Sequence, residues 1–81
     1  MYLEIITPEK KVFEGEITGV KVPGILGSFE ILNNHAPIVS ALGVGEVRVK
    51  TTKGEVLQYN IDGGVIEMND NVVSLLIESI K

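Results

Sequence analysis

Polar and apolar residues alternate along several short segments of the chain, and this period of two predicts β-strands. The alternation is clearest in Glu46–Thr52 and again in Glu55–Ile61, where apolar side chains recur at every second position. Lys53-Gly54 lies between the two segments and provides the glycine of a tight turn. The pair therefore predicts a β-hairpin.

The first half of the chain carries shorter strand patterns, separated by turn residues such as Pro23-Gly24. Gly19 interrupts one of these patterns, and a glycine inside a strand indicates a β-bulge. The expected strands of this half are Tyr2–Thr7, Lys11–Glu14, Glu16–Val22, Ser28–Leu32 and Ile38–Leu42.

The chain ends with two further expected strands, Val65–Met68 and Val72–Glu78. The second has apolar residues on both faces, which predicts a strand buried on both sides. No helical apolar stripe occurs, so about nine short strands predict an all-β fold, either a sandwich or a flattened barrel. Because no linker divides the chain, we expect one domain over residues 1–81.

Composition limits the classes of function. The formal net charge is −4, and Lys10-Lys11 is the only basic cluster, so neither nucleic acid nor anionic lipid is an expected partner. The apolar runs are too short to span a bilayer, and no signal pattern precedes them, so we expect a cytosolic protein without direct membrane insertion. Four aromatic residues and no cysteine predict an aliphatic core without disulfides.

His35 is the only histidine and therefore the first residue to test for chemistry. Ser28 or Ser40, with His35 and Glu30, could be imagined as a Ser–His–acid set, but nearness in sequence does not establish that geometry. A loop histidine that hydrogen-bonds locally before Pro37 explains the same residue without catalysis.

Metal and phosphate sites are not expected either. The acidic residues lack the spacing of a calcium loop, and one histidine without cysteine cannot build a transition-metal site alone. Gly63-Gly64 is better explained by a close backbone approach or a bend than by a ligand. No cofactor is therefore expected, and a domain of this kind usually acts through its surfaces.

Several segments together resemble the epsilon subunit of F-type ATP synthases, and the resemblance spans nearly the whole chain. His35-Ala36-Pro37 lies in the most recognisable of these segments, and its spacing from the others makes the resemblance specific. The segments are LEIITPEKKVFEG (3–15), VKVPG (20–24), GSFEIL (27–32), NHAPIVSAL (34–42), GEVRV (45–49) and GGVIE (63–67).

The resemblance implies a two-sheet, flattened β-sandwich of about ten short strands. It also implies a non-catalytic subunit of the central stalk, which links the gamma subunit to the membrane c-ring and couples ion translocation to ATP synthesis. Such a subunit would lie at the cytoplasmic face of the inner membrane, as a peripheral part of the complex. The sequence leaves the coupling ion open.

Alignment with the family implies two contact regions. Ser28 and His35 would lie at the end that faces the c-ring, and Thr7 and Ser40 would face gamma. Ile38, Val39 and Leu42 would be partly exposed beside Ser40 if an apolar interface lies there. The alternative explanations are that Ser28 and His35 only shape their own turns, and that the three apolar residues belong to the core.

The family commonly adds a C-terminal hairpin of two helices, which inhibits ATP hydrolysis and in some members binds ATP. Residues 1–81 contain no such helical domain, so neither activity is expected of them. Two other functions stay open at this point: a free-standing small β-sandwich that binds a ligand, and a small hydrolase that uses His35.

Overall fold

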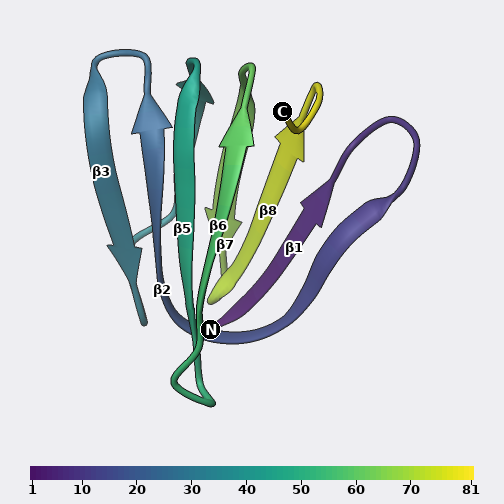
Figure 1. Cartoon of the computed structure of the whole chain (residues 1–81). Coiled ribbons are helices and arrows are strands. Elements are labelled where there is room, and N and C mark those ends of the chain that lie inside the picture. Colours follow the sequence, from purple (N-terminus) through teal and green to yellow (C-terminus); the bar gives the residue numbers. More distant parts are fainter.

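Eight strands and no helix make up the computed structural model, which describes residues 1–81 (Figure 1). One layer has the strand order β1-β8-β7-β4, and the other consists of β3, β2, β5 and β6. The strands are β1 (Tyr2–Ile6), β2 (Lys11–Gly24), β3 (Gly27–Leu32), β4 (Ile38–Leu42), β5 (Gly45–Thr51), β6 (Val56–Ile61), β7 (Gly64–Asn69) and β8 (Val72–Ile77).

The long strand β2 belongs to both layers. Its first half pairs with β1, and its second half lies between β3 and β5. The pairing with β5 shifts register between Ile17 and Gly19, so Thr18 is the extra residue of a bulge. A side chain at Gly19 would approach the Leu32 Cδ2 atom to 3.1 Å. The predicted bulge is therefore confirmed, and it lies where the strand passes from one layer to the other.

The all-β sandwich is confirmed, but with eight strands rather than about ten. The sequence pattern divides Lys11–Val22 at Gly15, whereas the structure continues the pairing there, with Gly15 opposite Leu3. The other expected strands agree with the observed ones to within one residue at either end. An isolated bridge between Ile61 and Ile80 adds one more short pairing after β8.

The core is aliphatic, as composition predicts. Its residues come from alternate positions of the strands, and no aromatic side chain is among them; Phe13, Phe29 and Tyr59 pack at its margin. The buried members are Met1, Leu3, Ile5, Ile17, Val20, Val22, Ile31, Leu42, Val47, Val49, Ile61, Ile66, Met68, Val73, Leu75 and Ile77.

The expectation that the last strand is buried on both sides is wrong. Leu75 is fully buried, but its neighbour Leu76 is 53% exposed and Val72 is 45% exposed. The reason is that no helix or further sheet covers the outer face of the β1-β8-β7-β4 layer. Apolar residues on both faces of β8 thus reflect one core face and one uncovered face.

Neighbouring leucines on β8 allow this difference to be measured. Leu75→Ala should lower the free energy of unfolding by about 2–5 kcal/mol, because it leaves a cavity in the core. Leu76→Ala should lower it by less than about 1 kcal/mol, because that side chain is half exposed. Urea denaturation of both variants gives the comparison, and equal losses would contradict the one-sided burial of β8.

Candidate binding surfaces

The outer face of the β1-β8-β7-β4 layer carries an apolar row that crosses four strands. Strand register aligns Ile6 with Leu76, Leu76 with Val65, and Val65 with Ala41. Val39, one pleat away on β4, is 68% exposed. We call Ile6, Val39, Ala41, Val65 and Leu76 the outer apolar face. Apolar side chains that line up across a sheet without a covering layer indicate a contact surface.

A glycine keeps two strands of this face close together. A side-chain carbon at Gly64 would lie 2.3 Å from the backbone oxygen of Leu76, so only glycine fits. This supports the interpretation of Gly63-Gly64 as a close backbone approach rather than a ligand site. Beside the two glycines lies an open hollow of about 580 Å³, which Thr7 and Pro8 border together with Leu76.

A second apolar surface lies where the β2–β3 and β4–β5 turns meet. Leu26 is 100% exposed, Val44 69% and Ile25 64%. The turns are joined because the Ile25 amide donates to the Ala41 carbonyl (3.2 Å) and the Gly43 amide to the Pro23 carbonyl (2.8 Å). We call Ile25, Leu26 and Val44 the apolar tip. Neither residues 22–29 nor residues 37–45 include a charged side chain.

The opposite end of the molecule is polar. There the β3–β4 loop meets the β7–β8 turn, and the Asn71 side chain joins them: its Oδ1 accepts from the Asn34 amide, and its Nδ2 donates to Asn33 Oδ1, both at 2.9 Å. His35 lies in the same loop, with its Nδ1 atom 2.7 Å from the Ala36 carbonyl oxygen. We call Asn33, Asn34, His35, Asp70 and Asn71 the polar end.

The structure does not bring Ser28 and His35 together. Ser28 pairs with Pro23 at the start of β3, next to the apolar tip, whereas His35 follows the other end of that strand. In Figure 1 the turn that joins β2 to β3 lies at the top and the far end of β3 lies at the bottom. One end of the sandwich therefore holds Ser28, and the other holds His35.

The other two expected contact residues lie nearer the apolar surfaces. Thr7 closes the β1–β2 turn, where its amide donates to the Lys10 carbonyl (2.9 Å), and it borders the outer apolar face. Ser40 is half-buried, on the opposite side of β4 from Val39. These two residues thus flank the apolar row without forming it.

The pleat of β4 decides how exposed its apolar residues are. Val39 points outward, Leu42 is buried, and Ile38 packs at the edge of the core. Of the three apolar residues expected to be partly exposed, Val39 is exposed and Ile38 partly exposed, whereas Leu42 belongs to the core. Sequence reasoning missed Ile25 and Leu26 as surface residues, although two apolar residues between the turn glycines Gly24 and Gly27 are a usable signal.

The outer face of the other layer carries two ion pairs. On that layer Lys50 pairs with Glu30 (3.7 Å), and Arg48 pairs with Glu46 (3.2 Å). These ion pairs separate the exposed apolar residues of that face, Leu32 (54%) and Val56 (52%). The outer apolar face, by contrast, is an unbroken apolar row, with Glu67 and Glu4 in the row beside it. A partner that buries apolar area would therefore select the β1-β8-β7-β4 layer.

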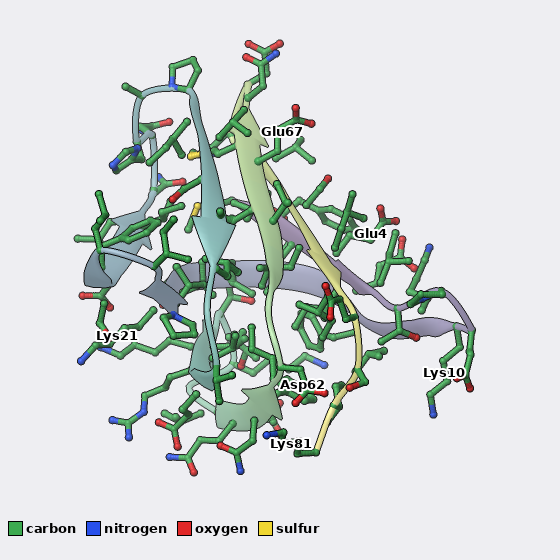
Figure 2. The ribbon with its side chains drawn as sticks, turned by 90° about the horizontal axis from the view of Figure 1, so that it is seen from above. Glu4, Lys10, Lys21, Asp62, Glu67 and Lys81 are labelled. Carbon is green, nitrogen blue, oxygen red and sulfur yellow. The ribbon has the colours of Figure 1, made fainter.

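A second set of charges fastens the C-terminal residues to the end of β6. The Asp62 carboxylate accepts a hydrogen bond from the Ser79 hydroxyl and lies 3.2 Å from Lys81 Nζ (Figure 2). The Ser79 hydrogen bond, and then Lys81, hold the pKa of Asp62 below its usual value. The lowered pKa means that the folded protein favours the charged carboxylate of Asp62. Its contacts with Ser79 and Lys81 therefore weaken only when acid protonates Asp62.

Lys11 makes two ion pairs where β1 pairs with β2. Its Nζ lies 3.0 Å from Glu4 and 3.2 Å from Glu14, and these hydrogen bonds, Glu4 first, raise its pKa above the usual value. Lys11 and Glu14 are exposed and Glu4 is partly exposed, so these ion pairs support the strand pairing only modestly.

The structure does not assemble a catalytic set. Glu30 pairs with Lys50, and the one side-chain hydrogen bond of His35 goes to Ala36, so the imagined Ser–His–acid set is not formed. No three His, Cys, Asp or Glu side chains gather closely enough to hold a metal ion. The structure also has no helix with the length and hydropathy needed to cross a membrane.

Comparison with known proteins places the chain among ATP synthase subunits. Residues 1–81 match the family model described as ATP synthase, Delta/Epsilon chain, beta-sandwich domain. The chain is 45% identical over 75 residues to the ATP synthase epsilon chain of Leptospira borgpetersenii, covering 91% of this chain but 58% of that one. It is 40% identical over 79 residues to the epsilon chain of Chlorobium limicola, covering 98% of this chain and 90% of that one.

Solved structures share the fold. A chain in the cryo-EM structure of the Euglena gracilis mitochondrial ATP synthase matches 98% of this chain with a TM-score of 0.90, at 23% identity, over 51% of its own length. A chain of the Tetrahymena thermophila mitochondrial ATP synthase matches with a TM-score of 0.84, at 19% identity, over 65% of its length. The family model and the curated relatives show that the chain belongs to the ATP synthase delta/epsilon family. Residues 1–81 form the β-sandwich domain of that family.

Proposed function

We propose that the protein is a non-catalytic rotor subunit of an F-type ATP synthase, which links the gamma subunit to the c-ring and couples ion translocation to ATP synthesis. The family match over residues 1–81 supports this function. The observation that carries it is the outer apolar face, which no part of the chain covers. In the complex, the subunit lies peripherally at the cytoplasmic face of the inner membrane.

Gamma is the proposed partner of the outer apolar face. The core of a permanent interface is apolar, and Val65 and Leu76 form an apolar cross-strand pair at the centre of this face. Thr7 lies at the border of the outer apolar face, and Ser40 follows Val39 along β4. This arrangement supports a gamma-facing role for Thr7, whereas the Ser40 side chain lies on the opposite side of β4 from the outer apolar face.

The apolar tip, with Ser28 beside it, is the proposed contact with the c-ring. A rigid sandwich that stands on a ring can rest on it with only one end, and Ser28 and His35 lie at opposite ends. The tip end is favoured because its turns are uncharged and expose Leu26 fully. We therefore propose ring contact for Ser28 and not for His35.

The sandwich suits the transmission of torque. Fifty backbone hydrogen bonds connect the chain, and 38 of them lie within the strand pairings. Because β2 pairs in both layers, the layers cannot slide past each other without breaking its ladder. A stiff body of this kind passes on rotation without a catalytic residue of its own.

The alternative of a free ligand-binding module has less support. Small-molecule sites are concave and combine apolar walls with a few converging polar groups. The largest hollow here is open; besides Gly63-Gly64 and apolar residues it is bordered by Thr7, Asp62 and Glu78, and the Asp62 carboxylate already pairs with Ser79 and Lys81. No aromatic side chain lines it, so no observation favours a ligand over a protein partner.

Two exposed valines on different layers test the gamma surface. Val65→Glu should weaken binding to the cognate gamma subunit by about tenfold or more, because the interface would bury an unpaired charge. Val56→Glu is the matched control, since Val56 is also exposed but lies on β6 in the other layer. Isothermal titration of the two purified chains gives both affinities. Equal affinities of the two variants would reject the outer apolar face as the gamma surface.

Single cysteines can distinguish the two ends, because the chain has none of its own. In the assembled enzyme, Ser28→Cys should cross-link to the c-ring through a short thiol-reactive linker, whereas His35→Cys should not. Both side chains are exposed, so access to the reagent is comparable. Cross-linking of His35→Cys to the ring, with none from Ser28→Cys, would reverse the proposed orientation.

A further inference from the structure

Asn71 connects three segments that are distant in sequence. Its backbone carbonyl accepts from the Tyr2 amide at 3.1 Å, which fixes the start of β1. Its side chain holds Asn33 and Asn34 of the β3–β4 loop through two hydrogen bonds of 2.9 Å. Both ends of the side-chain amide are thus used, one as acceptor and one as donor.

The hairpin fixes the backbone of Asn71 independently of these side-chain bonds. Asn69 pairs with Val72, so Asp70 and Asn71 form a two-residue turn. Their φ angles are 51° and 62°, as in the type I′ turn that suits the twist of a hairpin. The turn therefore presents the Asn71 side chain from a rigid base.

The β3–β4 loop has few other restraints. The His35 amide donates to the Leu32 carbonyl (3.1 Å), and the His35 ring bonds only to its neighbour Ala36. Asn34 has a φ of 65°, a conformation that costs energy unless local contacts support it. The hydrogen bond from its amide to Asn71 provides that support.

The loop also adjoins the outer apolar face. A hollow of about 360 Å³ lies where the loop leads into β4; it is bordered by Pro37 at the end of the loop and Val39 on β4, and by Glu67 and Asn69 on β7. The surface is therefore continuous from Val39 through Pro37 to the polar end, and a partner that covers Val39 would also contact the polar end. This continuity connects the loop to the surface proposed for gamma.

We propose that Asn71 is a positioning residue, which holds the His35 loop in one shape so that the loop extends the gamma-binding surface beyond the outer apolar face. The inference rests on the proposed function for the identity of the partner. The restraint of the loop by Asn71 can be measured on the isolated chain and does not depend on gamma.

The first experiment measures amide hydrogen exchange by NMR in Asn71→Gly. Glycine tolerates the positive φ and makes Asp70-Gly a favoured hairpin turn, so the fold is kept while the side-chain bonds are lost. Exchange at Asn34 should rise by about fivefold or more, with the exchange of core amides in β7 and β8 unchanged. Asp70→Gly is the matched control, because the Asp70 side chain makes no hydrogen bond to the loop, and it should leave Asn34 exchange as it is. Unchanged exchange at Asn34 in Asn71→Gly would overturn the restraint.

The second experiment measures gamma affinity in a double-mutant cycle. Asn71→Gly and His35→Ala should each weaken binding by about tenfold, and the double variant should bind no more weakly than either, because Asn71 acts through the loop that carries His35. Additive losses, or full affinity in Asn71→Gly, would overturn the positioning role. Failure of the proposed function itself would appear differently, as wild-type protein that does not bind gamma at all.

Discussion

Continuity of β2 is the constraint on which the rest of the structure depends. Over fourteen residues this strand pairs with β1, β3 and β5 and touches β4 at Gly24. The bulge at Thr18 turns it from one layer into the other, so that Ile17, Val20 and Val22 all face the same core. Where β2 ends, the β2–β3 turn begins, and the position of the apolar tip follows from the path of this one strand.

The small size of the sandwich explains why it leaves apolar residues uncovered. Two layers of short strands enclose one core, and each layer has an outer face that only solvent or a partner can cover. The β3-β2-β5-β6 layer meets solvent with ion pairs such as Lys50–Glu30, whereas the β1-β8-β7-β4 layer presents Val65 and Leu76. The two outer faces therefore differ in arrangement: an apolar row crosses all four strands of one, whereas the aligned rows of the other contain charged residues such as Lys21 and Arg48.

Local patterns in the sequence predict most of the strands, because alternation depends only on which side of a sheet each residue faces. Local patterns do not predict whether the outer face of a sheet is covered. Leu75 and Leu76 are neighbouring leucines, and Leu76 is a surface residue only because no layer covers its side of β8. Local patterns also do not predict that Ser28 and His35 lie at opposite ends of the sandwich, since this depends on the direction of β3 and on its register with β2. Resemblance to a family gives candidate residues, but strand direction decides which of them can touch the same partner.

The two ends of the sandwich differ in chemistry, and this difference gives a direction to an otherwise compact body. The tip end exposes Ile25, Leu26 and Val44 from uncharged turns, whereas the polar end fixes its loop through the amide groups around Asn71. The longest dimension of the domain, 26 Å, sets the scale of the distance between them. Because the strands run between these ends, any force applied at one end reaches the other through the same hydrogen-bonded ladders. A body with two unlike ends and an apolar side is therefore suited to hold one neighbour at its side while it stands on another, which is the geometry that the proposed rotor function requires.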